Sequence, residues 1–460
     1  MPTWLEKILP ILLLLAVVSV VVSRLPKVAL GHSPGFLRRR LGNWLPVGLA
    51  YAFLYFARYN LTAYKNAVGM SNADYGTIDQ WGAIVYGVSF LLNGPLADRF
   101  GGRATILAAM IGSGTMNVVM GVMALDGWRT EDAGTFALLY AGSMYFQSFG
   151  AVSIVKVNAS WFHLRERGTF GGIFGILISL GLYFAYDWGR LIAENFPHPY
   201  VFFVPAGVLA AMVLVVVAFV RDTPGEAGHP DFDTGDAGSG REGLPAEKPL
   251  AIVWRMVTNP AILTITAIEF CSGFLRNAVM KWYPVFAKAT HVNDQFVAQN
   301  WGMLLCCAGI LGGVMAGGIS DAVFGSRRGP VAAILYGGLL AATALMFGLL
   351  ATPWLGWTVI FSSLCVIGVH GMLSGTASMD FGGKKNVGIV VGIIDGFVYL
   401  GTAMQAYVLK RVLPDGPAAA DPEAWWTWSA AMLPIAVIGL LLSLRVWNAT
   451  AGAKAIPKAA

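Results

Sequence analysis

Four basic residues lie inside stretches of the chain that are otherwise apolar: Arg58, Lys156, Arg276 and Lys281. A cation near the centre of a bilayer costs between about 2.5 and more than 10 kcal/mol, so such a residue usually faces water, an anion or a carboxylate. The planar guanidinium of arginine matches phosphate or carboxylate oxygens with two parallel hydrogen bonds, whereas lysine offers a point charge. These residues indicate anion binding within a membrane, and the plainer alternative is a structural ion pair.

The composition of the chain indicates a membrane protein. Of its 460 residues, 56% are hydrophobic and 12% are charged, about half the charged fraction of an average soluble protein. Windows long enough for a helix to cross a bilayer occur at 8–23, 45–66, 79–97, 104–125, 134–158, 169–190, 200–220, 260–286, 297–320, 330–351, 356–378, 386–409 and 428–447. We therefore expect an all-α membrane protein.

The distribution of the 31 lysines and arginines predicts the orientation of the chain. Most of them fall in alternate loops, and positive charge concentrates on the cytoplasmic side of a membrane. The pattern places the N-terminus outside and the C-terminus in the cytoplasm. The first window is followed by its positive charges and by no small-residue cleavage site, so we interpret it as a retained helix and not a signal peptide.

The chain contains two related halves. The motif from Gly94 to Arg103 recurs from Gly317 to Arg328, and the two are separated by a linker rich in glycine, proline and acids. We expect an extra N-terminal transmembrane helix with a basic loop (1–43), a six-helix bundle (44–220), a cytoplasmic linker (221–255), a second six-helix bundle (256–447) and a cytoplasmic tail (448–460).

Arg58 and Arg276 are predicted to be symmetry mates. They are 218 residues apart, close to the offset between the two motifs, and each lies in the first helix of its half. In transporters built from paired halves, the substrate site lies near the bilayer midplane at the interface of the repeats. We therefore expect the two guanidinium groups to face one another and to share one anion.

Tyrosine and lysine side chains extend this expected site along the first helix of the first half. Tyr51 and Tyr55 lie seven and three residues before Arg58, on the same helix face. Their hydroxyl groups can donate to an anion or a sugar, and ordinary packing is an equal alternative. Lys65, seven residues after Arg58, either extends the cationic stripe or reaches the membrane surface.

Acidic residues and a histidine accompany the second arginine. Glu269 and Asp395 are expected to pair with Arg276 or Lys281 when the site is empty. The candidate cavity then carries a formal +2, which a divalent phosphate would neutralise, and this asymmetry favours obligatory exchange. His370 lies well inside an apolar window and is either a titrating group or a core histidine with a satisfied ring.

These motifs resemble the major facilitator superfamily and, within it, the organophosphate:phosphate antiporters. The superfamily resemblance rests on the two related motifs and covers about 44–447. The closer resemblance rests on a set of short segments: Phe56-Ala-Arg58-Tyr-Asn60, Trp161 with Arg165-Glu-Arg-Gly168, Arg221-Asp-Thr-Pro224, Arg276 through Lys281-Trp-Tyr-Pro284, and Lys384-Lys385 with Tyr399.

The resemblance implies two pseudo-symmetric six-helix bundles that rock about a central site where Arg58 and Arg276 hold a phosphoryl group. It also places Tyr51, Tyr55, Tyr86 and Tyr399 at cavity positions. The repeated motif supplies gating residues: Asp98, Arg99, Arg103, Asp321, Arg327 and Arg328. Family members that carry glycerol phosphate have a histidine where Ile178 stands and a lysine where Phe90 stands, so the chain departs from them at two site positions.

We expect a secondary transporter that exchanges an organic phosphate, such as a sugar phosphate, for inorganic phosphate. Glu269 and Asp395 keep a proton-coupled organic anion symporter as an alternative, because burial can raise the pKa of a carboxyl group. A transporter-like sensor of external phosphate esters is another, since some family members are sensors. We expect no enzyme, cofactor, metal site or nucleic-acid partner, and we expect a monomer in a bacterial inner membrane.

Overall fold

The computed structural model describes residues 12, 16, 19–20, 31–163, 175–177, 179–232, 234, 254, 258–292, 295–324, 327–373 and 378–448. Across these residues the regular structure is helical, without a β-strand. Most of the predicted first span at 8–23, most of the linker and nearly all of the tail lie outside the described residues.

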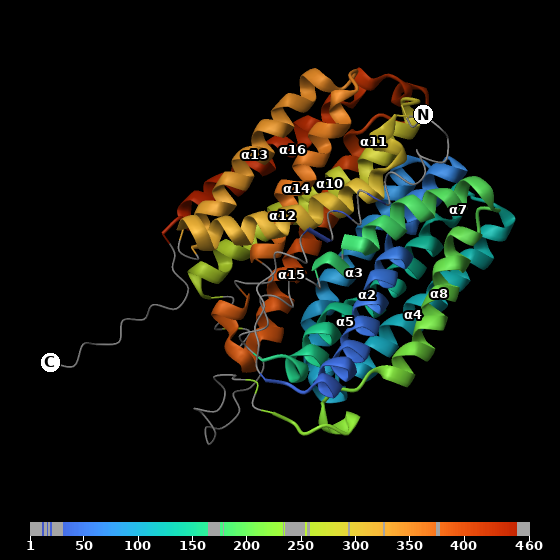
Figure 1. The fold of residues 1–460 in the computed structure, drawn as a ribbon. Helices are drawn as coiled ribbons and strands as arrows, with labels where there is room; N and C mark the ends of the chain where they lie inside the picture. Colours follow the sequence, from blue (N-terminus) through green and yellow to red (C-terminus); the bar gives the residue numbers. More distant parts are fainter. Residues whose placement is uncertain are drawn as a thin grey trace.

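The first half of the chain forms one group of helices, drawn in blue to green in Figure 1. Short turns at Ala124–Asp126 (η1) and Thr130–Asp132 (η2) join two of its helices, and Gly225–Ala227 (η5) follows the last. The long elements are α2 (Pro34–Val68), α3 (Asn72–Phe100), α4 (Gly102–Met123), α5 (Ala133–Trp161), η4 (Phe184–Trp188) continuing into α7 (Gly189–Asn195), and α8 (Tyr200–Phe219).

The second half forms a matching group beside the first, drawn in yellow to red in Figure 1. Short helices occur in its loops at Phe296–Gln299 (α11), Gly416–Ala420 (η8) and Pro422–Trp425 (η9). The long helices are α10 (Pro260–Ala289), α12 (Trp301–Phe324), α13 (Arg328–Leu349), α14 (Trp354–His370), α15 (Ser378–Val412) and α16 (Trp426–Arg445).

Nine helices in the described part of the chain are long and apolar enough to cross a bilayer. Helices α2 and α3 are long but are not among the nine, and they carry the buried polar residues Arg58 and Asp79. Helix α10 is among the nine and carries the buried residues Glu269, Arg276 and Lys281, so both kinds of helix bring polar groups to the interior.

Local sequence signals explain where α2 begins and ends and where α3 begins. The hydroxyl of Ser33 accepts a hydrogen bond from the amide of Phe36 at the start of α2, and Ser71 caps α3 in the same way. Gly69 ends α2 in the left-handed conformation (φ 68°), which glycine adopts without steric cost. Helices α2 and α3 therefore meet in a tight turn.

The two halves meet most extensively along α3 and α15. A Cβ atom on Gly87 of α3 would lie 2.8 Å from the carbonyl oxygen of Gly396 of α15, and one on Gly396 would lie 3.0 Å from the carbonyl oxygen of Gly87. The absence of side chains at these two positions lets the backbones approach closely, as is usual where membrane helices pack.

Candidate anion-binding site

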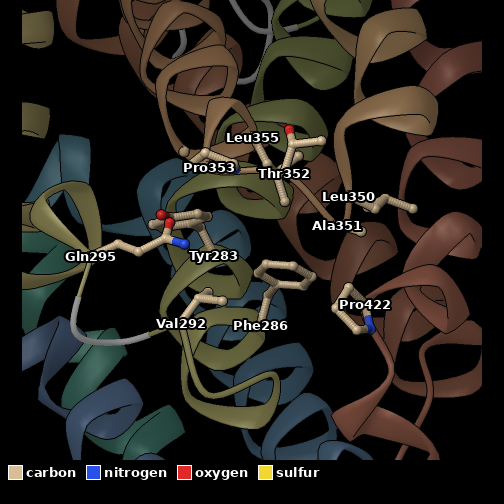
Figure 2. Close-up of a pocket in the computed structure, with 11 residues that line it drawn as sticks. Tyr283, Phe286, Val292, Gln295, Leu350, Ala351, Thr352, Pro353, Leu355 and Pro422 are labelled. Carbon is tan, nitrogen blue, oxygen red and sulfur yellow. The ribbon is translucent and has the colours of Figure 1, made fainter.

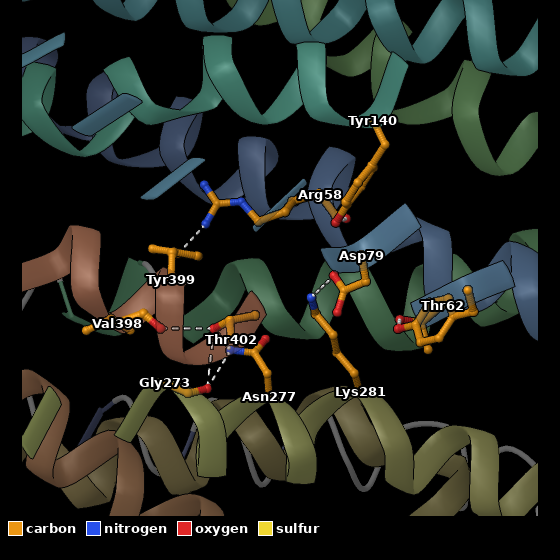
Figure 3. Close-up of polar contacts among 11 residues, drawn as sticks. Arg58, Thr62, Asp79, Tyr140, Gly273, Asn277, Lys281, Val398, Tyr399 and Thr402 are labelled. Atoms are coloured by element: carbon orange, nitrogen blue, oxygen red, sulfur yellow. Dashed lines mark hydrogen bonds and ion pairs between the residues drawn. The ribbon is translucent and has the colours of Figure 1, made fainter. Parts of the chain in front are cut away.

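Arg58 lies in the middle of α2 with 1% of its surface exposed, held by three hydrogen bonds to neutral oxygens. Its Nε donates to Gln147 Oε1 at 2.7 Å, and its two terminal nitrogens donate to the hydroxyls of Tyr86 and Tyr399, each at 2.8 Å. The bond to Tyr399 crosses from the first half to the second (Figure 3). The guanidinium is fixed in place while its charge stays uncompensated.

An aromatic cage surrounds this guanidinium. Its central carbon lies 4.6 Å from the ring centroid of Tyr55 and 4.5 Å from that of Tyr86, where the negative faces of the rings attract a cation. Tyr51 packs on Tyr55, and the ring of Phe90 lies 4.9 Å from that of Tyr86. The predicted tyrosines therefore gather around Arg58, and Phe90 fills the position where glycerol phosphate carriers have a lysine.

Arg276 reaches the same place from the second half. Its guanidinium carbon lies 5.9 Å from the ring centroid of Tyr399, and that of Arg58 lies 6.0 Å from the same centroid. Arg276 is 6% exposed, and its Nε is buried without a hydrogen-bond partner. The structure thus brings both arginines to one tyrosine.

Neither of these guanidinium groups forms an ion pair within the part of the chain that the structure describes. A buried charge without a partner is costly, and breaking a buried pair typically costs 3–5 kcal/mol for that reason. Two such charges at one tyrosine are the arrangement expected of a site that is completed by an anionic ligand.

Lys281, another predicted site residue, lies 5.4 Å from the ring centroid of Tyr59, which packs on Tyr55 of the aromatic cage. It forms a buried ion pair with Asp79 of α3, again across the two halves (Figure 3). Asp79 stands at the first position of the predicted window 79–97, where an acid is easily interpreted as a boundary residue. An acidic partner for Lys281 was predicted, and the structure supplies Asp79 in this role.

Glu269 pairs with a different residue from those predicted. Its Oε2 lies 2.9 Å from Nδ1 of His370, at the end of α14. Arg276 is seven residues further along α10, about 10 Å of helix rise, which explains why the nearer imidazole is the partner. The predicted pairing of Asp395 with Arg276 or Lys281 stays a prediction.

The two remaining lysines of the predicted site lie away from the arginines. Lys65 is buried and donates to the carbonyl of Met70 at 2.9 Å, at the end of α2. Lys156 is exposed and follows Gln147 by nine residues on α5, about 13 Å along the axis. Helical periodicity correctly put them on helices of the first half but did not measure their distance from Arg58.

The predicted gating motif of the first half is anchored to the start of the linker. The amide of Arg103 donates to Asp222 Oδ1 at 2.8 Å, and burial raises the pKa of that carboxyl group. Arg99 is exposed, and the side chains of Asp98 and Asp321 lie outside the described residues. In the second half, Arg327 donates to the carbonyl of Phe324 and Arg328 to the hydroxyl of Ser320.

Two residues that bond to predicted site residues were not themselves predicted from the sequence. Gln147 accepts from Arg58 and donates to Ser113 Oγ at 2.9 Å, so its amide orientation is set from both sides. A lone amide in the apolar window 134–158 was the available signal. Asp79, the partner of Lys281, is the second such residue. The sequence indicated it only as an acid at the edge of the predicted span 79–97.

Hydrogen bonds between the halves lie at one end of the molecule. Asp187 of η4 accepts from the amides of Gly302 and Met303 in the first turn of α12, at 2.8 and 2.9 Å. Arg190 donates to the carbonyl of Gln299 at 2.8 Å. Among the described residues, every such bond lies at the level of Tyr399 or further toward the end where α2 stops and α3 begins.

A separate pocket lies in the second half, between α10 and the loop that joins α13 to α14 (Figure 2). It has a volume of about 360 Å³, and Tyr283, Phe286, Leu355 and Pro422 are among its lining residues. Among the described residues that line it, none is charged.

Comparison with known proteins places this geometry in a family. The model of the Major Facilitator Superfamily matches residues 47–406. The chain belongs to this superfamily. It is an integral membrane protein of the organophosphate:phosphate antiporter family within it, as its relatives show. The predicted fold class is confirmed, whereas the extra N-terminal helix stays a prediction.

Two relatives and one solved structure illustrate the similarity. The chain is 26% identical over 433 residues to the membrane sensor protein UhpC of Salmonella typhimurium, covering 88% of this chain and 91% of that protein. It is 24% identical over 424 residues to a probable hexose phosphate transport protein of Chlamydia trachomatis, covering 87% and 90%. A bacterial homologue of the human lysosomal transporter Spinster, inward-facing and unoccupied, shares the fold with a TM-score of 0.66 at 13% identity, over 91% of this chain and 98% of that one.

Proposed function

We propose that this protein is a secondary transporter that exchanges an organic phosphate, such as a hexose phosphate, for inorganic phosphate. The observation that carries the proposal is the meeting of Arg58 and Arg276, one from each half, at Tyr399 without a carboxylate partner. A family relative named as a probable hexose phosphate transport protein supports the choice of substrate class.

The hydrogen-bonding capacity of the cluster suits a phosphoryl group. A guanidinium has five N–H donors. Arg58 uses three of them on its neighbours, and within the described part of the chain Arg276 uses none. Tyr86 and Tyr399 accept from Arg58, so each hydroxyl keeps its own proton to donate to a ligand oxygen. A divalent phosphate would neutralise the two arginines and occupy these donors.

The charge of the empty site favours exchange over one-way flux. Two uncompensated cations are stabilised by water or an anion, so an empty site resists being closed off and moved across the bilayer. A loaded site is neutral and can close. Lys281 is neutralised by Asp79. Arg58 and Arg276 then carry the formal charge of +2 that was predicted for the cavity.

The contacts at one end of the halves support alternating access. They must break for the central site to open at that end, and the rocking of paired halves about a fixed midplane site is how such transporters work. With the predicted orientation, the joined end faces the outside and the protein lies in a bacterial inner membrane. One chain holds both arginines, so we propose a monomer.

Two other functions have specific support. The relative named as a membrane sensor protein favours a receptor that binds a phosphate ester without carrying it. The contact between the fully buried Glu269 and His370, at 2.9 Å, favours proton-coupled symport, because proton relays in membrane transporters are built from carboxyl and imidazole side chains.

Purified protein in vesicles distinguishes the three. Exchange requires that uptake of labelled phosphate depend on phosphate inside the vesicle. Uptake driven by a pH gradient into vesicles that contain no phosphate would instead support symport. Saturable binding of hexose phosphate without any flux would support a sensor. Vesicles with Lys288→Gln protein, which changes an exposed lysine in the last turn of α10, serve as the control.

A further inference from the structure

A groove runs along the outer surface of the contact between the halves. It is lined by Gln80 and Ile84 of α3, by Phe270 of α10, and by Ala403, Met404 and Tyr407 of α15, and it borders about 650 Å³ of empty space. Met404 and Tyr407 are 46% and 43% exposed. Because this part of α15 is an apolar, membrane-spanning segment, the groove opens toward the acyl chains of the bilayer.

Two cations stand at one end of this groove, on the turn of α15 that follows Tyr407. Lys410 donates to Gln80 Oε1 at 2.8 Å and to Thr77 Oγ1 at 3.1 Å, so its ammonium lies on a residue that lines the groove. The guanidinium carbon of Arg411 lies 3.6 Å from the ring centroid of Tyr407. Both cations are therefore attached to the groove lining.

The hydrogen-bond partners of these cations are neutral. Arg411 donates to the carbonyl of Tyr407 at 2.8 Å, and Lys410 to an amide and a hydroxyl. Within the described residues neither cation contacts a carboxylate. Both keep N–H groups for another acceptor, since lysine has three donors and arginine five.

We propose that this groove is a binding site for an anionic phospholipid. The apolar groove and the cations follow one another along α15 in the same order as the acyl chains and the phosphate of a lipid. A zwitterionic lipid would bring its own cation toward Lys410 and Arg411, which like-charge repulsion disfavours. Basic side chains near a membrane surface attract anionic lipids, so two of them predict a preference for an anionic lipid of roughly tenfold or more.

The site has a consequence for the transport cycle because both halves build it. Gln80 and Ile84 come from the first half, whereas the other lining residues come from the second. A ligand that binds only one arrangement of two parts shifts the equilibrium toward that arrangement. An anionic lipid in the groove therefore stabilises the state in which the halves are joined at this end.

The experiment compares retention of two lipids by the purified full-length protein in detergent, using native mass spectrometry. Phosphatidylglycerol and phosphatidylcholine with identical acyl chains are added at matched concentrations, with and without inorganic phosphate. The variants are Lys410→Gln/Arg411→Gln, Arg411→Gln alone, and a control, Arg129→Gln/Lys288→Gln, that removes two exposed cations elsewhere.

We expect wild type and control to retain phosphatidylglycerol about tenfold better than phosphatidylcholine, whether or not phosphate is present. The preference for phosphatidylglycerol should fall severalfold in Arg411→Gln and disappear in the double variant. Arg411→Gln removes only contacts with Tyr407 of the same helix, so it should leave the contact between the halves intact. Equal retention of the two lipids by wild type would overturn the proposal. An unchanged preference in both groove variants, or one abolished by inorganic phosphate, would do the same.

Discussion

The two central arginines are symmetry mates in the sequence but differ in their surroundings. Arg58 is held by Gln147, Tyr86 and Tyr399, whereas Arg276 has no hydrogen bond to any residue that the structure describes, and its Nε is buried. An unsatisfied buried donor costs about 1–3 kcal/mol, and more when it is charged. In the proposed site the first half thus supplies a pre-positioned donor, and the second supplies a donor that would be satisfied by the phosphoryl group.

Substitution of Arg58 should have the largest overall effect, because it lowers both transport and stability. Arg58→Lys keeps the charge but leaves acceptors on Gln147 and the two tyrosines without their donors. We expect transport to fall about 100-fold or more and the free energy of unfolding to fall by about 2–4 kcal/mol. Vesicle exchange and a thermal-shift assay measure the two quantities. Full exchange activity in this variant would show that the fork of Arg58 does not hold the substrate.

Substitution of Arg276 should lower transport without lowering the stability of the empty protein. Arg276→Lys removes the fork that faces the ligand, so exchange should again fall about 100-fold. The melting temperature without substrate should stay within about 2 °C of wild type, because no hydrogen bond is lost in the empty protein. A loss of stability as large as that of Arg58→Lys would refute the asymmetry between the mates.

Helix α10 also carries Lys281, which differs from Arg276 because it forms an ion pair with Asp79. Asp79→Asn leaves the charge of Lys281 buried and unpaired, so we expect a loss of about 3–5 kcal/mol. The double variant Asp79→Asn/Lys281→Met should recover most of that loss, because it removes the orphaned charge as well. Thermal unfolding of the two variants measures the recovery, and a double variant no more stable than the single one would show that the ion pair is not the cause.

The smallest effect is expected at the acid that lies closest in sequence before Arg276. Glu269 bonds to His370 and not to the arginine, so Glu269→Gln should change phosphate exchange less than about threefold. Exchange should also show the same dependence on pH in this variant as in wild type. Loss of uptake in Glu269→Gln together with loss of a pH-gradient effect would instead favour proton coupling.

Hydropathy predicted the helices well because a bilayer requires long apolar windows. The window 104–125 corresponds to α4 (Gly102–Met123), and 200–220 to α8 (Tyr200–Phe219). The start of α2 was predicted eleven residues too late, at 45 instead of Pro34. Its first turns are basic and capped by Ser33, and a helix extended beyond the apolar core has no hydropathy signal.

The site was predicted in part because the internal repeat shows which residues are related by symmetry. The repeat does not show which residues form hydrogen bonds or ion pairs with them. The offset between the halves correctly paired Arg58 with Arg276. The contacts of Arg58 with Gln147 and of Lys281 with Asp79 join residues 89 and 202 positions apart. Helical periodicity says which residues share a face of one helix, but not which faces of different helices meet.

Equilibrium binding of labelled inorganic phosphate to the purified protein tests the central claim most directly. The account predicts one saturable site per chain, displaced by hexose 6-phosphate and not by hexose, and lost in both Arg58→Gln and Arg276→Gln while Lys288→Gln binds normally. Binding of wild-type affinity in either arginine variant, with the protein folded, would contradict the shared phosphoryl site.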